Sequence, residues 1–125
     1  EDLKSVLSGI TSPKGRIHFS FGTPLNSFLE NLKGDALNLN GLSEATAAEM
    51  DRQIHHMFRL FPNNYIASDM LSGKQEFAAN YTGDEFSRFS EYVSRKTGGV
   101  EGDKDELRKL FLNLYARPVL NRFPG

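Results

Sequence analysis

The sequence contains one clear β-strand pattern, and this lone strand limits the folds open to the chain. Residues 16–21 alternate between polar side chains at even positions and apolar side chains at odd positions. A single strand leaves backbone donors and acceptors unpaired along both edges. The weak candidates for a partner are residues 36–40 and 75–81. We therefore predict a mainly α fold whose one short strand pairs with a weak local segment, with a second copy of the chain, or with a sheet outside this sequence.

Helical periodicity and helix end signals account for most of the remaining sequence. They indicate about five helices. The strongest start signal is a capping box of Thr82 and Glu85, flanked by a hydrophobic staple of Tyr81 and Phe86. A long helix is predicted over residues 43–61, capped by a serine at its first position. Its expected buried stripe consists of Ala47, Met50, Ile54, Met57, Phe58 and Phe61.

Other boundaries follow from turn residues and from proline. Residues 35–42 place turn formers between leucines and are predicted to be a loop. The last helix is expected to open at Asp103 and Glu106 and to end at Pro118, because proline cannot continue the helical hydrogen bonding. We find no internal repeat and no linker long enough to divide the chain.

Length and composition favour one globular domain. The chain has 125 residues, a net charge of −1 and no cysteine. The balanced charge argues against a non-specific nucleic-acid binder, which would carry a basic excess. No apolar run approaches the roughly 18–20 residues that span a bilayer, and no secretory signal is evident. We expect a cytoplasmic location. The amphipathic pattern already present at residues 3–10 suggests a piece of a longer protein.

The residues that commonly bind metals or act as nucleophiles do not stand at the spacings that such sites need. The three histidines are His18, His55 and His56. His55 and His56 are adjacent, so on a helix their side chains point about 100° apart and do not easily grip one ion. The His-Glu-x-x-His motif, the nucleophile elbow and the phosphate-binding glycine loop are absent from the sequence. We predict no metal, no cofactor and no catalytic residue in this chain.

A basic cluster on the long predicted helix is the one candidate binding site. Arg52, His56 and Arg59 stand at i, i+4 and i+7 and should share one helical face. Arginine presents a rigid fork of donors that suits phosphate. The cluster is therefore a candidate site for a phosphate or for an anionic membrane surface. A charged face that is simply solvated remains the alternative.

Two stretches resemble glycerolipid acyltransferases. Residues 14–25 read Lys-Gly-Arg-Ile-His-Phe-Ser-Phe-Gly-Thr-Pro-Leu, which resembles a strand segment that follows the main catalytic motifs in that family. Residues 49–55 and 61–67 read Glu-Met-Asp-Arg-Gln-Ile-His and Phe-Pro-Asn-Asn-Tyr-Ile-Ala. They resemble the C-terminal extension of a bacterial branch of 1-acyl-glycerol-3-phosphate or glycerol acyltransferases. Together these stretches cover about the first 70 residues.

The resemblance implies the C-terminal region of a larger α/β acyltransferase of phospholipid biosynthesis. Residues 1–34 would be the tail of the catalytic fold and residues 35–125 a helical extension. The parent protein would move a fatty acyl group from a thioester carrier to a glycerophosphate-type acceptor. It would work at the cytoplasmic face of the membrane.

The sequence departs from the family at the catalytic motif. The family's reaction resembles general-base catalysis by a histidine with an aspartate five residues later. Here Thr23, Leu60 and Phe61 stand five residues after the three histidines. The resemblance therefore implies that this chain alone is inactive.

Two other functions remain open. One is a small helical protein-interaction module without enzymatic activity. The other is a stand-alone hydrolase that uses His55 or His56. A homodimer through residues 16–21 is a further expectation, since pairing of two strand edges would satisfy their backbones and cover their apolar face.

Overall fold

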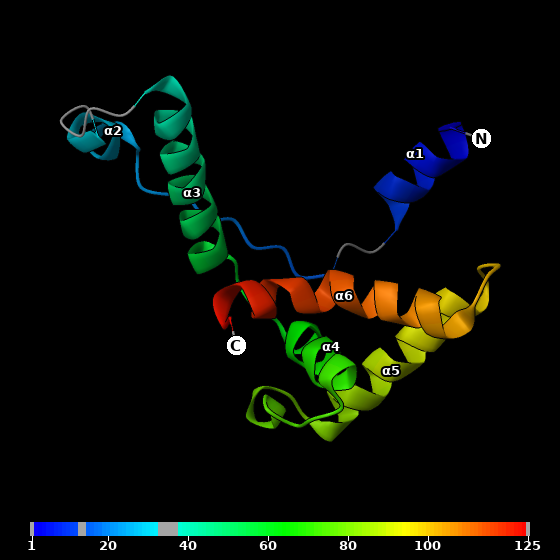
Figure 1. The fold of residues 1–125 in the computed structure, drawn as a ribbon. Helices are drawn as coiled ribbons and strands as arrows, with labels where there is room; N and C mark the ends of the chain where they lie inside the picture. The colour runs from blue at the N-terminus through cyan, green and yellow to red at the C-terminus, as the bar shows by residue number, and fades with distance from the viewer. Residues whose placement is uncertain (1, 13–14, 33–37, 125) are drawn as a thin grey trace.

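The computed structural model describes residues 2–12, 15–32 and 38–124. Over these residues the chain forms six α-helices, one 3₁₀ turn and no strand (Figure 1). The elements are α1 Asp2–Thr11, α2 Asn26–Leu32, α3 Leu39–Met57, α4 Pro62–Ser72, η1 Ala78–Asn80, α5 Gly83–Gly98 and α6 Lys104–Arg122. The prediction of a mainly α fold is confirmed, and the predicted strand is wrong.

The hydrophobic core lies where α4, α5 and α6 meet. α4 packs most extensively against α6, and both contact α5 (Figure 1). The short side chains of Ala67 on α4 and Ala116 on α6 are fully buried and let these two helices approach closely. The buried apolar residues are Ile66, Ala67, Phe89, Val93, Leu112, Ala116 and Val119.

Aromatic side chains join α5 to α6 beside this core. The ring of Phe89 meets Tyr115 edge-on, with centroids 5.1 Å apart, and the rings of Tyr92 and Phe111 lie 5.9 Å apart. Such pairs add to the stabilisation that burial gives. Burial, with a hydrogen bond to Tyr92, raises the pKa of Tyr115 to about 12.

The capping box that opens α5 is confirmed. Thr82 Oγ1 accepts a hydrogen bond from the Glu85 amide at 3.2 Å, and Glu85 Oε2 accepts one from the Thr82 amide at 2.9 Å. The staple residues Tyr81 and Phe86 stack with centroids 6.1 Å apart. Phe86 is nevertheless exposed. The buried face of α5 consists of Phe89 and Val93.

The long helix predicted over residues 43–61 is displaced in the structure. α3 begins at Leu39, where Asn38 Oδ1 accepts a hydrogen bond from the Gly41 amide at 2.8 Å. Residues 39–42 are therefore helical rather than loop; residues 35–37 lie outside the described residues. α3 ends at Met57, and Phe61 is extended, as the residue before a proline prefers to be. Pro62 instead opens α4.

The expected buried stripe of this helix is also wrong. No residue of α3 is buried, and Met50, Ile54 and Phe58 are exposed. Helical periodicity identifies an apolar face but does not provide a neighbour to cover it. α3 meets the rest of the fold chiefly near its C-terminal end, where it contacts α6 (Figure 1).

Pro118 lies inside α6 and does not end it. α6 continues to Arg122 although proline offers no amide to the Leu114 carbonyl one turn earlier. Ala116 and Val119 on either side are fully buried. Packing of this helical face therefore outweighs the missing backbone hydrogen bond.

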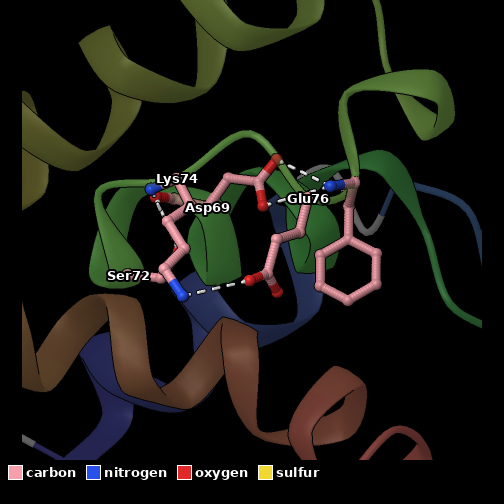
Figure 2. Close-up of polar contacts among 5 residues, drawn as sticks. Asp69, Ser72, Lys74 and Glu76 are labelled. Carbon is pink, nitrogen blue, oxygen red and sulfur yellow. Dashed lines mark hydrogen bonds and ion pairs between the residues drawn. The ribbon is translucent and has the colours of Figure 1, made fainter. Parts of the chain in front are cut away.

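The buried carboxylate of Asp69 holds the connection between α4 and α5 in place through hydrogen bonds. α4 closes at Gly73, whose φ of 69° suits glycine. The Asp69 carboxylate then accepts the Phe77 amide at 3.2 and 3.1 Å and the Tyr81 hydroxyl at 2.8 Å. Figure 2 shows Asp69 reaching this amide beside an ion pair of 3.4 Å between Lys74 and Glu76. Residues 75–81 are therefore a turn and 3₁₀ segment, not the strand partner considered from the sequence.

Residues 16–21 run without a strand partner among the described residues. Their apolar side chains point away from the helices: Ile17 is 65% exposed, Phe19 82% and Phe21 95%. The expected alternation into two faces is retained, but no part of the described chain covers the apolar face. Pairing of two copies through this segment stays a prediction.

The opposite face of the same segment lies against the helices. The Arg16 guanidinium stands 5.0 Å from the centre of the Phe61 ring, and the Ser20 hydroxyl lies 3.3 Å from the Met57 carbonyl oxygen. A Cβ added at Gly22 would approach the tip of Gln53 to 2.5 Å. The polar side chains therefore attach this segment to the end of α3 and the start of α4.

Candidate functional site

The structure brings together two of the three residues of the predicted basic cluster. Arg52 and His56 are both on α3 and line one hollow of about 200 Å³, together with residues from the end of α6. Arg59 lies beyond the end of α3 at Met57 and lines a separate hollow of about 270 Å³. The i, i+4, i+7 spacing aligns side chains only within one helix. Arg59 lies outside α3, so it does not share a helical face with Arg52 and His56.

Arg52 is held by a carboxylate one turn earlier on α3. Its Nε and Nη2 atoms donate to the two oxygens of Glu49 at 2.7 Å each. These bonds, with one from Gln53, lower the pKa of Glu49 to about 2, and the same pair raises the pKa of Arg52. The paired charge leaves Arg52 less available to an anion. Anion binding by Arg52, His56 and Arg59 stays a prediction.

The hollow beside Arg59 contains a serine and a histidine in contact. Ser20 Oγ lies 2.8 Å from His18 Nε2. No described carboxylate bonds to His18, and the pair is exposed on a segment without helix or strand. A hydrolase would need the imidazole oriented by an acid and donors for the developing oxyanion. The arrangement does not supply them.

Arg122 is a structural cation at this site that the sequence did not reveal. From the last turn of α6 it donates to the carbonyls at the end of α3: Nη2 lies 2.8 Å from the His55 oxygen and 2.6 Å from the His56 oxygen. A third bond goes to the Phe58 carbonyl. Carbonyls at the end of a helix lack intrahelical partners and carry partial negative charge. Arg122 therefore fastens α3 to α6.

We expect Arg122→Ala to release the end of α3. Lost charge-assisted hydrogen bonds should cost about 1.5–3 kcal/mol in free energy of unfolding. Amides of residues 55–58 should exchange with solvent much faster, while those of α5 stay protected. Arg122→Lys is the matched control: it keeps the charge without the fork and should retain part of the protection. Unchanged exchange in the alanine variant would contradict this role.

A larger groove runs between α3 and α6. It encloses about 530 Å³ and is called here the α3–α6 groove. Its apolar walls are Ile54, Phe58, Leu110, Leu114 and Pro118. Its polar lining consists of His55, Asn113, Arg117 and Asn121. Among the described residues no carboxylate lines it, so the formal charge on these walls is that of Arg117, and the imidazole of His55 is the other titratable group.

The hydrogen bonds at the C-terminal ends of α3 and α6 close this groove at one end. Asn121 Nδ2 lies 3.2 Å from His55 Nε2, beside the bonds of Arg122. From there the two helices diverge (Figure 1). Leu110 and Leu114 therefore stand toward the open end, and Asn121 toward the closed end.

Among the described residues, no cluster of three or more His, Cys, Asp or Glu side chains could hold a metal ion. Over the same part of the chain, no helix has both the length and the apolar character needed to cross a membrane. No family model, no curated protein and no solved structure matches the chain. We therefore infer function from the geometry of the residues and from the resemblance noted in the sequence.

Proposed function

We propose that this chain is the C-terminal segment of an acyltransferase that moves a fatty acyl group from a thioester carrier to a glycerophosphate-type acceptor. In this proposal, residues 1–34 complete the catalytic α/β part and residues 35–125 form a helical extension. The segment supports the catalytic part and supplies no catalytic group. The observation that carries the proposal is the outward apolar face of residues 16–21.

This apolar face has the features of a strand that lacks its sheet. Three large apolar side chains alternate with polar ones along a segment without helix or strand, and each is at least 65% exposed. Burial against a neighbouring layer would stabilise them, and a neighbouring strand would satisfy the backbone. α1 adds a second uncovered stripe, made of Leu3, Val6, Leu7 and Ile10. A catalytic sheet in the same polypeptide would cover both surfaces.

The second resembling stretch has a structural place in the fold. Asn64, which is buried, accepts the Phe61 amide on Oδ1 at 2.8 Å and donates from Nδ2 to the Tyr115 carbonyl at 2.8 Å. One side chain thus starts α4 and ties it to α6. This supports a scaffolding role for the Phe-Pro-Asn-Asn-Tyr-Ile-Ala stretch of the helical extension.

The histidines are not arranged as a catalytic base. His18 contacts Ser20, and His55 contacts Asn121. None of the three histidines bonds to a carboxylate among the described residues. A histidine that acts as a general base in the way proposed for the family needs a carboxylate side chain to orient its imidazole. The parent's catalytic groups would therefore come from outside this chain.

The test compares the 125-residue chain with the full reading frame that contains it. We expect the frame to encode a His-x-x-x-x-Asp block upstream, and its purified product to transfer acyl groups from an acyl thioester to lysophosphatidate. The isolated chain should show no turnover. A frame without that block, or turnover by the isolated chain that is lost in His55→Ala or His56→Ala, would refute the proposal.

A single substitution examined in both proteins tests the role of the apolar face. Phe19→Ser should leave the melting temperature of the isolated chain nearly unchanged, because the ring is already 82% exposed. In the full-length product the same change should lower stability, because there the ring would be covered. Leu39→Ser, on the exposed start of α3, is the control for a change outside that face.

The alternative function is a helical module that binds another protein. The same uncovered apolar face favours it, with the cover supplied in trans rather than by the same polypeptide. The reading frame separates the two functions: a frame without an upstream acyltransferase motif would favour the interaction module.

A further inference from the structure

We propose that the α3–α6 groove binds a soluble single-chain amphiphilic anion, such as a medium-chain carboxylate. The alkyl chain would lie between the two helices, and the carboxylate would meet Arg117. This inference stands on the groove alone and does not depend on the acyltransferase proposal.

The size and walls of the groove suit one alkyl chain. Its volume of about 530 Å³ falls within the roughly 300–1,000 Å³ of small-molecule sites. Leu114 is 74% exposed and Leu110 is similarly uncovered, so an alkyl chain would remove apolar surface of both from water. Leu110 and Arg117 are seven residues apart on α6, about 10 Å along its axis. An alkyl chain can span that distance.

Arg117 gives the groove its preference for an anion. Its guanidinium makes no hydrogen bond or ion pair with any described residue. The side-chain amides of Asn113 and Asn121 stand one turn before and after it on the same face of α6. Asn113 Nδ2 already donates to the Lys109 carbonyl at 2.9 Å, and Asn121 Nδ2 lies 3.2 Å from His55 Nε2. A carboxylate at this point would therefore meet the forked cation of Arg117 and at most one further N–H from each amide.

The end of α3 does not oppose an anion at the closed end. Free carbonyls at a helix C-terminus would repel it. Here Arg122 already binds the carbonyls of His55, His56 and Phe58. The helix end is therefore neutralised by a residue outside the groove lining.

The concave shape favours a free amphiphile over a bilayer. Helices that bind a membrane surface insert a protruding apolar face into it. The α3–α6 groove is a hollow between two helices and closes at one end, so it accommodates a single chain. A lipid that remains in a bilayer is the competing occupant.

Titration calorimetry with decanoate tests the proposal. Each methylene buried in the groove should tighten binding about fourfold. Decanoate has four methylenes more than hexanoate, so burial of only two of them should already make it bind at least about tenfold more tightly. Decanol, which lacks the charge, should bind about tenfold more weakly than decanoate. Equal affinity for decanol and decanoate, or no binding of decanoate, would overturn the proposal.

Two variants locate the site, and a third controls for charge. Arg117→Gln should weaken decanoate binding about tenfold, and Leu114→Glu, which places a carboxylate in the groove, should abolish it. Both residues are exposed, so thermal unfolding should stay near wild type. Arg95→Gln removes the same charge from α5, away from the groove, and should change affinity by less than about twofold. Equal loss in the Arg95 and Arg117 variants would overturn the assignment.

Vesicles separate the two sources of an amphiphilic anion. Binding to phosphatidylglycerol vesicles without binding to dissolved decanoate would assign the groove to a membrane lipid and overturn the proposal. Decanoate binding that depends on Arg117, with or without vesicle binding, would support it.

Discussion

Replacing Ile66 by alanine should lower the free energy of unfolding by about 2–5 kcal/mol. Ile66 is on α4, is 0% exposed and lies in the core that α4 forms with α5 and α6. Truncation would remove buried methyl groups and leave a cavity in the most closely packed part of the fold. Chemical denaturation monitored by helical circular dichroism would measure the loss.

Ile54→Ala is the matched control for this substitution. It makes the same chemical change on α3, where Ile54 is 54% exposed. We expect a loss within about 1 kcal/mol, since surface substitutions usually have small effects. The sequence alone placed Ile54 in a buried stripe and would predict a loss as large as that for Ile66. Similar losses in the two variants would mean that another surface covers α3.

Helix boundaries were predictable where the signals are local. The capping box of Thr82 and Glu85 forms as expected, and Asp103 caps α6 by accepting the amides of Asp105 and Glu106. These contacts join residues two or three positions apart, so the order of residues contains the whole interaction. The ion pair of Glu49 and Arg52 is equally local and could have been foreseen from its spacing.

Burial was less predictable, because it depends on segments distant in sequence. The apolar stripe of α3 has the right period, yet most of it has no covering helix. Residues 16–21 keep the alternating faces of a strand, but their pairing would need a partner that the described residues do not provide. Arg122 shows the same limit within the site: it binds carbonyls 64–67 residues away. Only the folded arrangement of α3 and α6 reveals that contact.

Asp69→Ala should be the most damaging change outside the apolar core. The carboxylate is only 4% exposed and is bonded by the Phe77 amide and the Tyr81 hydroxyl. Alanine would leave both donors without their acceptor, at an expected cost of about 2–4 kcal/mol in free energy of unfolding. Amides of residues 75–81 should lose protection from hydrogen exchange before those of α5 and α6. A loss below about 1 kcal/mol would show that water replaces the carboxylate.

Tyrosine variants divide this cost between the two donors. Tyr81→Phe removes only the hydroxyl bond to Asp69 and should cost about 1–2 kcal/mol. Tyr65→Phe removes a hydroxyl that makes no hydrogen bond to a described residue, so its effect should stay within about 0.5 kcal/mol. Comparable losses in the two tyrosine variants would contradict a specific bond at Tyr81.

Alkaline titration gives an independent measure of the Asp69–Tyr81 contact. Burial first, then the hydrogen bond and charge of Asp69, raise the pKa of Tyr81 above its usual value of 10.0. A group whose pKa is raised by folding stabilises the fold fully below its unfolded pKa, and that stabilisation is lost as pH rises through the folded pKa. Asp69→Asn removes the charge but not the burial. The Tyr81 phenol should therefore ionise at lower pH, and the alkaline loss of stability should be smaller than in the wild type. An unchanged ultraviolet titration of the phenol would mean that burial alone sets this pKa.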